Sequence, residues 1–357
     1  MGDSLDGLRA ALQGQYAIKR ELGRGGMATV YLAQDEKHDR PVALKILHPH
    51  LAATLGPDRF TREIKLAAKL QHPHICGVLD SGEAAGQLWF TMPYVEGETL
   101  RERLNRERQI ALDEAVRLMH EAADALDYAH RHGVVHRDIK PENILLADGH
   151  VLVADFGVAK ALHPSGPHLT GPGAPQADSI TATGMAIGTP AYMSPEQASG
   201  SREIDARTDV YALGCVFYEM LAGEPPYSGP NAQSIIAKRL AVDATPLAVV
   251  RPDLPASLSS AVSRALHRTP AERYAATGES ARAVDAAVRP STRLVAVGAG
   301  RNQRSWVLFA LGLVIGLGVL FAWRQNHGRG VTNVSVIKRL AVLPFEDPPA
   351  QGDLDHV

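Results

Sequence analysis

Hydrophobic and polar positions follow two different periods along the first 285 residues. Residues 16–95 contain short runs such as YAIKREL, TVYLAQ and VALKIL, which are separated by glycine or proline turns. This pattern predicts antiparallel strands, interrupted by one amphipathic helix with the sequence RFTREIKLAAKLQ. In residues 96–285 the apolar positions recur every three or four residues, as in LDEAVRLMHEAADALDYAHRHG. The segment DVYALGCVFYEMLAG is apolar on nearly every face and predicts a fully buried helix.

A third pattern appears in residues 305–323, which read SWVLFALGLVIGLGVLFAW and contain no charge. A helix of this length measures about 28 Å, close to the ~30 Å hydrocarbon core of a bilayer. Trp306 and Trp323 lie near its ends and Arg304 and Arg324 flank it, which is typical of membrane spans. A buried core helix is the alternative. We expect a single transmembrane helix, and we expect no signal peptide because the N-terminal residues lack an apolar stretch.

Composition sets limits on the function. With 45% apolar and 21% charged residues, the chain has an ordinary globular composition. Its net charge of −2 provides no basic surface for nucleic acid, so we expect no nucleic-acid partner. The two cysteines, Cys76 and Cys215, are too few for a disulfide framework or a Cys-rich zinc site. They fit core positions in a reduced, cytosolic domain.

A glycine-rich turn, GRGGMATV, lies between the first two predicted strands. The following segment is a strand, which argues against a dinucleotide-binding fold, and no P-loop motif occurs. Glycines in such a turn let backbone N–H groups approach phosphate oxygens, although an ordinary hairpin turn is the alternative. Lys45 lies on the next strand and Glu63 on the predicted helix. Glu63 could supply the counter-ion of Lys45 while Lys45 holds phosphate, or the two could form a solvated surface pair.

The strongest chemical signal is HRDIKPEN, which is followed by DFG. Between them, NILLADGHVLVADFG predicts a hairpin with an Asp-Gly turn. Such a hairpin brings Asn143 and Asp155 to its open end, where an amide and a carboxylate oxygen suit Mg²⁺. Asp138 could then accept a hydroxyl proton, and Lys140 could neutralise charge on a phosphoryl group in transfer.

Six segments in this order carry a family resemblance: GRGGMATVYLA, VALK, HRDIKPEN, DFG, GTPAYMSPE and DVYALGCVFYEML. Over about residues 16–280 they resemble the bacterial eukaryotic-type (Hanks-type) Ser/Thr protein kinases, and among these the membrane-anchored, receptor-like subgroup. The resemblance implies an α+β, two-lobed kinase fold with a β-rich N-lobe and a helical C-lobe. It also implies ATP with Mg²⁺ or Mn²⁺, and protein substrates that contain Ser or Thr. Lys140 and Thr189 favour Ser/Thr over Tyr acceptors.

The resemblance also assigns roles to single residues. Asp138 is the catalytic base, Lys140 and Asn143 are the other catalytic residues, and Asn143 and Asp155 are the metal ligands. Met92 corresponds to the gatekeeper, and the Val95 N–H to the adenine-binding hinge. The remaining nucleotide-binding residues are Leu22, Gly23, Gly25, Gly26, Val30, Ala43, Lys45, Glu63 and Leu145.

Two positions depart from the family pattern, and neither carries a catalytic atom. Ala28 replaces the third glycine of the loop, and Ser194 stands where the pattern has alanine. We expect Glu196, two residues after Ser194, to pair with Arg273.

Three function classes remain open: an active kinase, a pseudokinase scaffold, and a receptor whose kinase is an output module. Because every catalytic position is filled, we expect an active enzyme that phosphorylates its own activation loop. Residues 163–184 are rich in Gly, Pro, Ser and Thr and predict a mobile loop. A phosphate on this loop could pair with Arg137, and Thr181 and Thr183 are the expected sites.

The expected organisation assigns residues 1–15 to a tail, 16–95 and 96–285 to the two lobes, 286–304 to a juxtamembrane linker, and 305–323 to the span. Residues 324–357 would form an extracytoplasmic stub that begins a truncated C-terminal domain, since ATP requires a cytoplasmic kinase in a single-pass protein of the cell membrane. Basic residues are balanced on the two sides and give no orientation. Gly312 and Gly316 form a G-x-x-x-G pair, which would let two spans approach closely and form a homodimer; glycines without a role in pairing are the alternative.

Overall fold

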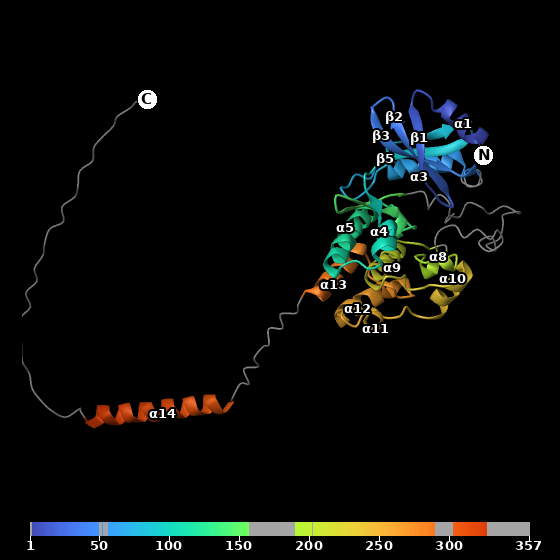
Figure 1. Ribbon diagram of the computed structural model, residues 1–357. Coiled ribbons are helices and arrows are strands. Elements are labelled where there is room, and N and C mark those ends of the chain that lie inside the picture. The colour runs from blue at the N-terminus through green and yellow to red at the C-terminus, as the bar shows by residue number, and fades with distance from the viewer. Residues whose placement is uncertain are drawn as a thin grey trace, which may run out of the picture. The chain divides into compact units, whose positions relative to one another are not determined.

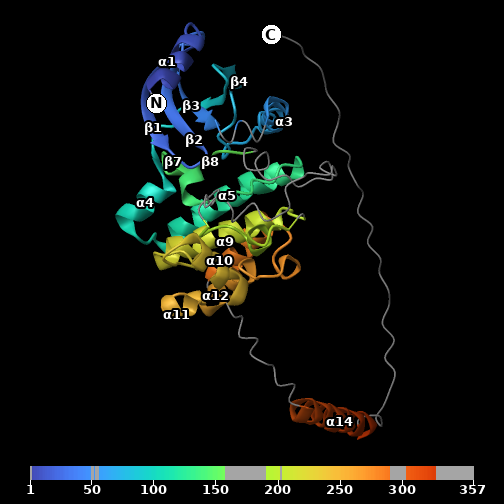
Figure 2. The same ribbon diagram turned by 90° about the vertical axis from the view of Figure 1, so that its right-hand side faces the viewer.

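The computed structural model describes residues 2–49, 52, 56–156, 190–201, 203–289 and 303–326. The chain divides into two compact units, Met1–Pro290 and Ser291–Val357, each of which is treated by itself. The predicted loop at 163–184, with Thr181 and Thr183, lies outside the described residues, as does Thr189. In the first unit, strands gather at one end and helices at the other (Figures 1 and 2), so the predicted two-lobed fold is confirmed.

The N-lobe contains a five-stranded sheet in the order β1-β2-β3-β5-β4, in which every neighbouring pair is antiparallel. Its strands are β1 (Tyr16–Arg24), β2 (Ala28–Asp35), β3 (Arg40–Leu47), β4 (Asp80–Ala84) and β5 (Gln87–Pro93). Helix α3 (Pro57–Ala67) packs its buried Phe60 and Ile64 in one apolar cluster with Phe90 of β5. Trp89, which points to the opposite face, belongs to a different cluster.

That second cluster contains a helix that the sequence analysis had treated only as a tail. Helix α1 (Gly2–Ala11) buries Leu8 in the cluster of Trp89, together with Leu12 and Tyr16. Leu5, Leu8 and Leu12 form a stripe at helical spacing, so the local pattern for this helix was present. The Tyr16 and Trp89 rings meet edge to face, with centroids 5.4 Å apart. The first residues therefore cover one face of the sheet.

The C-lobe is built around helix α9 (Arg207–Ala222), which is buried at every position from Thr208 to Leu221, as its apolar sequence predicted. In the described part of the lobe, the other helices of four or more residues are α4 (Leu100–Glu107), α5 (Leu112–Arg131), α8 (Pro195–Ala198), α10 (Ala232–Ala241), α11 (Leu247–Val250), α12 (Ala256–Ala265) and α13 (Thr277–Val288). A small sheet of β6 (Glu98–Thr99), β7 (Ile144–Ala147) and β8 (His150–Val153) and two 3₁₀ turns, η1 (Pro141–Asn143) and η2 (Pro270–Glu272), complete the lobe.

The second unit contains helix α14 (Gln303–Asn326), which includes the apolar segment 305–323. Its described large apolar side chains, from Leu313 to Trp323, are exposed. Within the described part of the chain, no helix has both the length and the hydropathy needed to cross a membrane. The expected transmembrane helix is therefore not confirmed.

Candidate active site

The glycine-rich turn joins β1 to β2, as the sequence predicted. The Gly25 N–H donates to the carbonyl of Ala28 at 2.9 Å and closes the turn, while Gly23 lies opposite Val30 in the strand register. A side chain added at Gly23 or Gly26 would meet no atom within 4 Å, so the backbone there faces open space. The turn can thus present N–H groups to a ligand beneath it.

Below this turn, all six apolar residues assigned to the adenine pocket gather in one cluster. Ala43 of β3 and Met92 of β5 are buried and lie opposite each other in the register of the two strands. The partly buried members of the cluster are Leu22, Val30, Val95, Leu145 and Leu152. Strands from the N-lobe and the β7–β8 hairpin of the C-lobe therefore form the two walls of one apolar slot. Such a slot can hold a flat, largely apolar ring.

Lys45 forms an ion pair in this slot, but its partner differs from the expected one. Its Nζ lies 2.5 Å from Oδ2 of Asp155, and among the described ion pairs it forms none with Glu63. Burial alone would raise the pKa of Asp155, but the charge and hydrogen bond of Lys45 more than offset burial, so this pKa lies below its usual value. Asp155 has a φ of 68°, which turns its carboxylate toward β3. The buried carboxylate thus takes the ammonium that was assigned to Glu63.

The β7–β8 hairpin has the predicted Asp-Gly turn, with φ values of 50° at Asp148 and 80° at Gly149. Both values are positive, as a type I′ turn requires. At the open end of the hairpin, the Ala154 N–H donates to the carbonyl of Asn143 at 2.9 Å. The hairpin therefore brings Asn143 close to Asp155, as predicted.

Asp138 lies beside this open end and is held by two side chains. Lys140 Nζ donates to Asp138 Oδ2 at 2.6 Å, and Asn143 Nδ2 donates to the same oxygen at 3.2 Å. Asn143 Nδ2 also donates to the Asp138 carbonyl at 2.7 Å. These contacts hold the Asp138 carboxylate next to the Lys140 ammonium. Neither of the two side-chain bonds uses Asp138 Oδ1. The arrangement can accept a proton from a hydroxyl and stabilise negative charge that develops nearby.

The backbone of His136 and Arg137, just before Asp138, is held in place by Asp209, which lies near the start of α9. Its two carboxylate oxygens accept the backbone N–H groups of His136 and Arg137, each at 2.8 Å. The fully buried Asp209 also accepts from His130 Nε2 at 2.8 Å. Burial alone would raise the pKa of Asp209, but its bond to His130 and the neighbouring charges lower it. Asp209 therefore stays ionised and anchors the catalytic loop to the most buried helix.

The segment Pro190–Gln197 rests against the other side of the catalytic loop. Gln197 Nε2 donates to the Arg137 carbonyl at 2.8 Å. Glu196 accepts two hydrogen bonds of 2.7 Å from the fully buried Arg273. The predicted Glu196–Arg273 pair is confirmed, and its two parallel bonds give it fixed geometry.

The polar groups at the open end of the hairpin fit a magnesium ion. Among the described atoms, Asp155 Oδ1 is buried and has no hydrogen-bond partner. Asn143 donates with its amide nitrogen, which leaves its oxygen as the acceptor. A carboxylate and an amide oxygen at the same end of the hairpin match the few protein ligands that Mg²⁺ takes.

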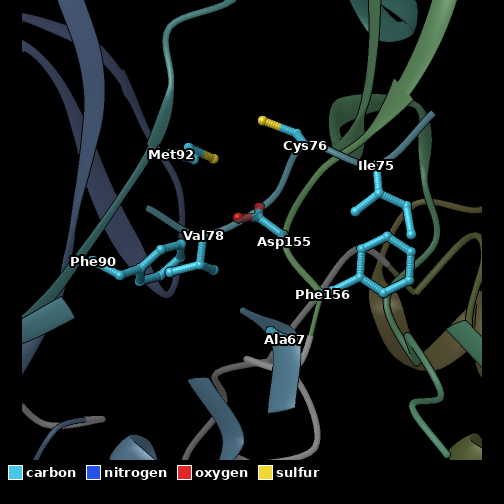
Figure 3. A pocket seen from close by; sticks show the side chains of 8 residues that line it. All are labelled: Ala67, Ile75, Cys76, Val78, Phe90, Met92, Asp155 and Phe156. Atoms are coloured by element: carbon cyan, nitrogen blue, oxygen red, sulfur yellow. The ribbon is translucent and has the colours of Figure 1, made fainter. Parts of the chain in front are cut away.

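A small pocket continues behind Met92, toward α3 (Figure 3). It is lined by Met92, Cys76, Phe90, Val78, Ala67, Ile75, Asp155 and Phe156. The Asp155 carboxylate and the Phe156 ring point in different directions from the chain, and that ring packs edge to face on His136. Burial, with a smaller contribution from Asp155, raises the pKa of the Cys76 thiol to about 12. Cys76 is therefore an inert thiol in the wall of the slot.

The sequence analysis missed two residues of this site. Cys76 was predicted to be a core residue, and neither its residue type nor its spacing indicated that it lies beside Met92. Asp209 had a usable signal, because it is the one carboxylate in the first turn of a helix that is otherwise almost wholly apolar. A buried acid in such a helix needs polar partners.

Comparison with known proteins agrees with this geometry. Residues 16–281 match the family model described as "Protein kinase domain". The chain is 41% identical over 276 residues to serine/threonine-protein kinase PknB of Mycobacterium tuberculosis, covering 75% of this chain and 42% of the relative. It is 35% identical over 290 residues to PknH of Mycobacterium bovis, covering 81% and 46%. The chain thus spans less than half the length of these relatives.

Among solved structures, the crystal structure of a point mutant of the Mycobacterium tuberculosis PknI kinase domain is similar to the chain. It has a TM-score of 0.60 and 34% identity, and the match covers 76% of this chain and 95% of that domain. The similarity therefore extends over nearly the whole of the solved domain.

Proposed function

The chain belongs to the protein kinase family, with bacterial serine/threonine kinases among its relatives, and we propose that it transfers the γ-phosphoryl group of ATP to Ser and Thr hydroxyls of proteins. The observation that carries this proposal is the Asp138 carboxylate, held by Lys140 at 2.6 Å beside the Lys45–Asp155 pair. The site thus brings together a carboxylate that can accept the proton of a hydroxyl and two lysine ammonium groups that can bind phosphate oxygens. Phosphoryl transfer needs this combination.

Each group in the centre has a distinct task in this proposal. Asp138 orients the acceptor hydroxyl and takes its proton as the new P–O bond forms and the bond to the leaving diphosphate breaks. Lys140 stays bonded to Asp138 and stabilises negative charge on the transferred group. Lys45 holds the phosphates that precede it, and the glycine turn covers them. When bound, Mg²⁺ would be held by Asn143 and Asp155 and would supply charge neutralisation on the phosphates.

The test is transfer of label from γ-labelled ATP to a protein acceptor by the full chain in the presence of Mg²⁺. The control is Asp138→Asn, which keeps the size of the side chain and removes the base. Label from the wild-type chain alone supports the kinase assignment. Equal labelling by both chains would contradict it, and so would labelling by neither, which is the result expected of a pseudokinase scaffold.

Autophosphorylation forms a separate part of the proposal and rests on sequence. Thr181 and Thr183 precede the GTPAYMSPE segment, and Arg137 precedes the catalytic Asp138. A phosphothreonine could bond the Arg137 guanidinium and order the loop. We expect phosphate at these two residues and a roughly tenfold lower rate in the double alanine variant. Phosphopeptide mass spectrometry of the active enzyme tests this, and phosphate only outside 165–185 would contradict it.

Membrane attachment also rests on the sequence of residues 305–323 and on the exposed apolar side chains of α14. In this proposal, the kinase faces the cytoplasm, the linker 286–304 connects it to the span, and Gly312 and Gly316 allow two spans to pair. The test compares the full chain with residues 1–290 in membrane fractionation after an alkaline carbonate wash. Release of the full chain into the wash would contradict a span. Equal self-association of Gly316→Ile and wild type would contradict pairing.

A further inference from the structure

A buried arginine, Arg239, stands out in the C-lobe because the proposed chemistry does not use it. It lies on α10 with 0% exposure and is the largest of the fully buried side chains among the described residues. Its Nη1 donates to the carbonyl of Pro190 at 2.5 Å, and its Nη2 to the carbonyl of Ala191 at 2.7 Å. Its Nε donates to the hydroxyl of Tyr211 at 3.1 Å.

The electrostatics of Arg239 differ from those of Arg273, whose guanidinium also lies near the Tyr211 ring. Arg273 is neutralised by Glu196, whereas no carboxylate of the described residues forms an ion pair with Arg239. The Arg239 guanidinium lies 5.3 Å from the ring centroid of Tyr227 and 5.9 Å from that of Tyr211. Among the described residues, two carbonyl oxygens, the Tyr211 hydroxyl and two aromatic rings therefore take the place of water around this buried charge.

The buried Arg239 guanidinium restricts the backbone of Pro190 and Ala191. A buried cation without a carboxylate is tolerated only where its donors find oxygen atoms. The guanidinium fork is planar and rigid, so its two Nη atoms accept only a narrow range of carbonyl positions. Movement of residues 190–191 would remove both carbonyl acceptors of the Arg239 Nη atoms. Arg239 thus restrains this backbone more strongly than an apolar contact of the same size.

The restrained segment lies beside the catalytic loop. Gln197 bonds the Arg137 carbonyl, one residue before Asp138, and Arg101 of α4 bonds both Glu142 and the Tyr192 hydroxyl. The nucleotide slot is formed by the sheet and by the β7–β8 hairpin. Residues 190–197 contact the loop that carries Asp138 and contribute no side chain to the slot, so they are available to a protein acceptor that approaches Asp138 from the C-lobe side.

We propose that Arg239 is a positioning residue for the protein acceptor: it fixes the Pro190–Ala191 backbone against which the acceptor segment binds, without contributing to the nucleotide slot. This proposal rests on the proposed kinase activity. Arg239 touches neither Asp138 nor the residues of the slot, so its effect should be confined to the acceptor.

The experiment measures steady-state phosphorylation of dephosphorylated casein by the full chain, with ATP and casein varied separately, together with hydrolysis of ATP by water. Arg239→Met keeps the length of the side chain and removes all donors, and Arg239→Lys keeps the charge and one donor group. Lys238→Met is the matched control, because Lys238 is the adjacent, exposed cation of α10 and donates to the carbonyl of Ser228. A melting curve with and without ADP and Mg²⁺ shows which variants are folded.

We expect Arg239→Met to lower kcat/KM for casein by about tenfold or more, while KM for ATP and the rate of ATP hydrolysis change less than about twofold. Arg239→Lys should give an intermediate loss and Lys238→Met none. If Arg239→Met does not fold, Arg239→Lys decides by the same split. Wild-type casein kinetics in the folded variants, or a parallel loss of casein phosphorylation and ATP hydrolysis, would overturn this proposal alone. A wild-type chain that labels no casein would overturn the proposed function itself.

Discussion

The nucleotide slot and the segment Pro190–Gln197 flank the same catalytic loop but are held by different forces. The slot is formed by apolar side chains from neighbouring strands and a hairpin. The segment is held by three arginines from separate parts of the C-lobe, Arg101, Arg239 and Arg273. Apolar contacts weaken in proportion to the volume that is lost, whereas a buried charge fails as a unit when its partner is removed. The slot should therefore tolerate conservative changes that the segment does not.

The largest effect is expected at Asp155, which forms an ion pair with Lys45 at the slot. Asp155→Asn removes the charge that faces Lys45 and the carboxylate proposed for Mg²⁺, and we expect the rate of phosphoryl transfer to fall by about 10²–10³-fold or more. Lys45→Ala should reduce the rate by at least a similar factor. Asp148→Asn makes the same change at the exposed turn of the same hairpin and should leave the rate unchanged. Initial rates with labelled ATP test this, and near-wild-type activity of Asp155→Asn would contradict the assignment.

The next largest effect is expected in the segment Pro190–Gln197, which is held by buried charges. Glu196→Ala leaves the fully buried Arg273 without its carboxylate, and we expect the free energy of unfolding to fall by about 3 kcal/mol. The exposed Glu203, in the same loop region, provides the control, because Glu203→Ala should change the stability by less than about 0.5 kcal/mol. Urea denaturation measures both values. A loss at Glu196 as small as that at Glu203 would show that the segment is not held by this pair.

A matched pair of substitutions tests the volume rule for apolar contacts on the face of the sheet opposite the slot. Leu8 of α1 is 0% exposed against the sheet. We expect Leu8→Ala to destabilise the chain by about 2 kcal/mol, because it leaves a cavity, and Leu8→Met to cost less than about 1.5 kcal/mol. Thermal unfolding followed by circular dichroism distinguishes the two. Equal losses would mean that shape, rather than volume, governs this face.

The smallest effect is expected at Met92 in the slot. Met92→Leu conserves volume and polarity, so KM for ATP should change by no more than a few-fold. The measurement is ATP saturation at a fixed concentration of protein acceptor. A change of a hundredfold would show that Met92 contributes more than apolar packing, and the contrast between the two regions would then fail.

The features that could be predicted from the sequence are those with local or residue-type signatures. The Asp148–Gly149 turn predicted the hairpin, and the hairpin in turn predicted that Asn143 would lie near Asp155. The pairing of Glu196 with Arg273, although 77 residues apart in the chain, followed from the family pattern. These features depend on which residues are present and on short spacings.

Other features depend on tertiary geometry that no spacing reveals. Arg239 bonds main-chain carbonyls, and a carbonyl carries no residue type that a sequence pattern could detect. Lys45 was expected to pair with Glu63, and its ion pair with Asp155 depends on how the chain turns at Asp155, which no sequence spacing shows. Helix α1 had its apolar stripe, but a helix of ten residues is marginal alone and needs a surface from elsewhere in the chain.

Helix α1 is synthesised before the strands that provide this surface. Tyr16 packs on Trp89, and Gln15 and Tyr16 both bond Asp80, so the partners of the first residues are made roughly 70 residues later. At 5–20 residues per second, a ribosome needs about 4–15 s to reach them. During this interval the leucines of α1 lack the β4–β5 part of the sheet face that they cover. Helix α1 is therefore synthesised before the sheet face that buries it is complete, and its apolar stripe stays partly uncovered until β5 is made.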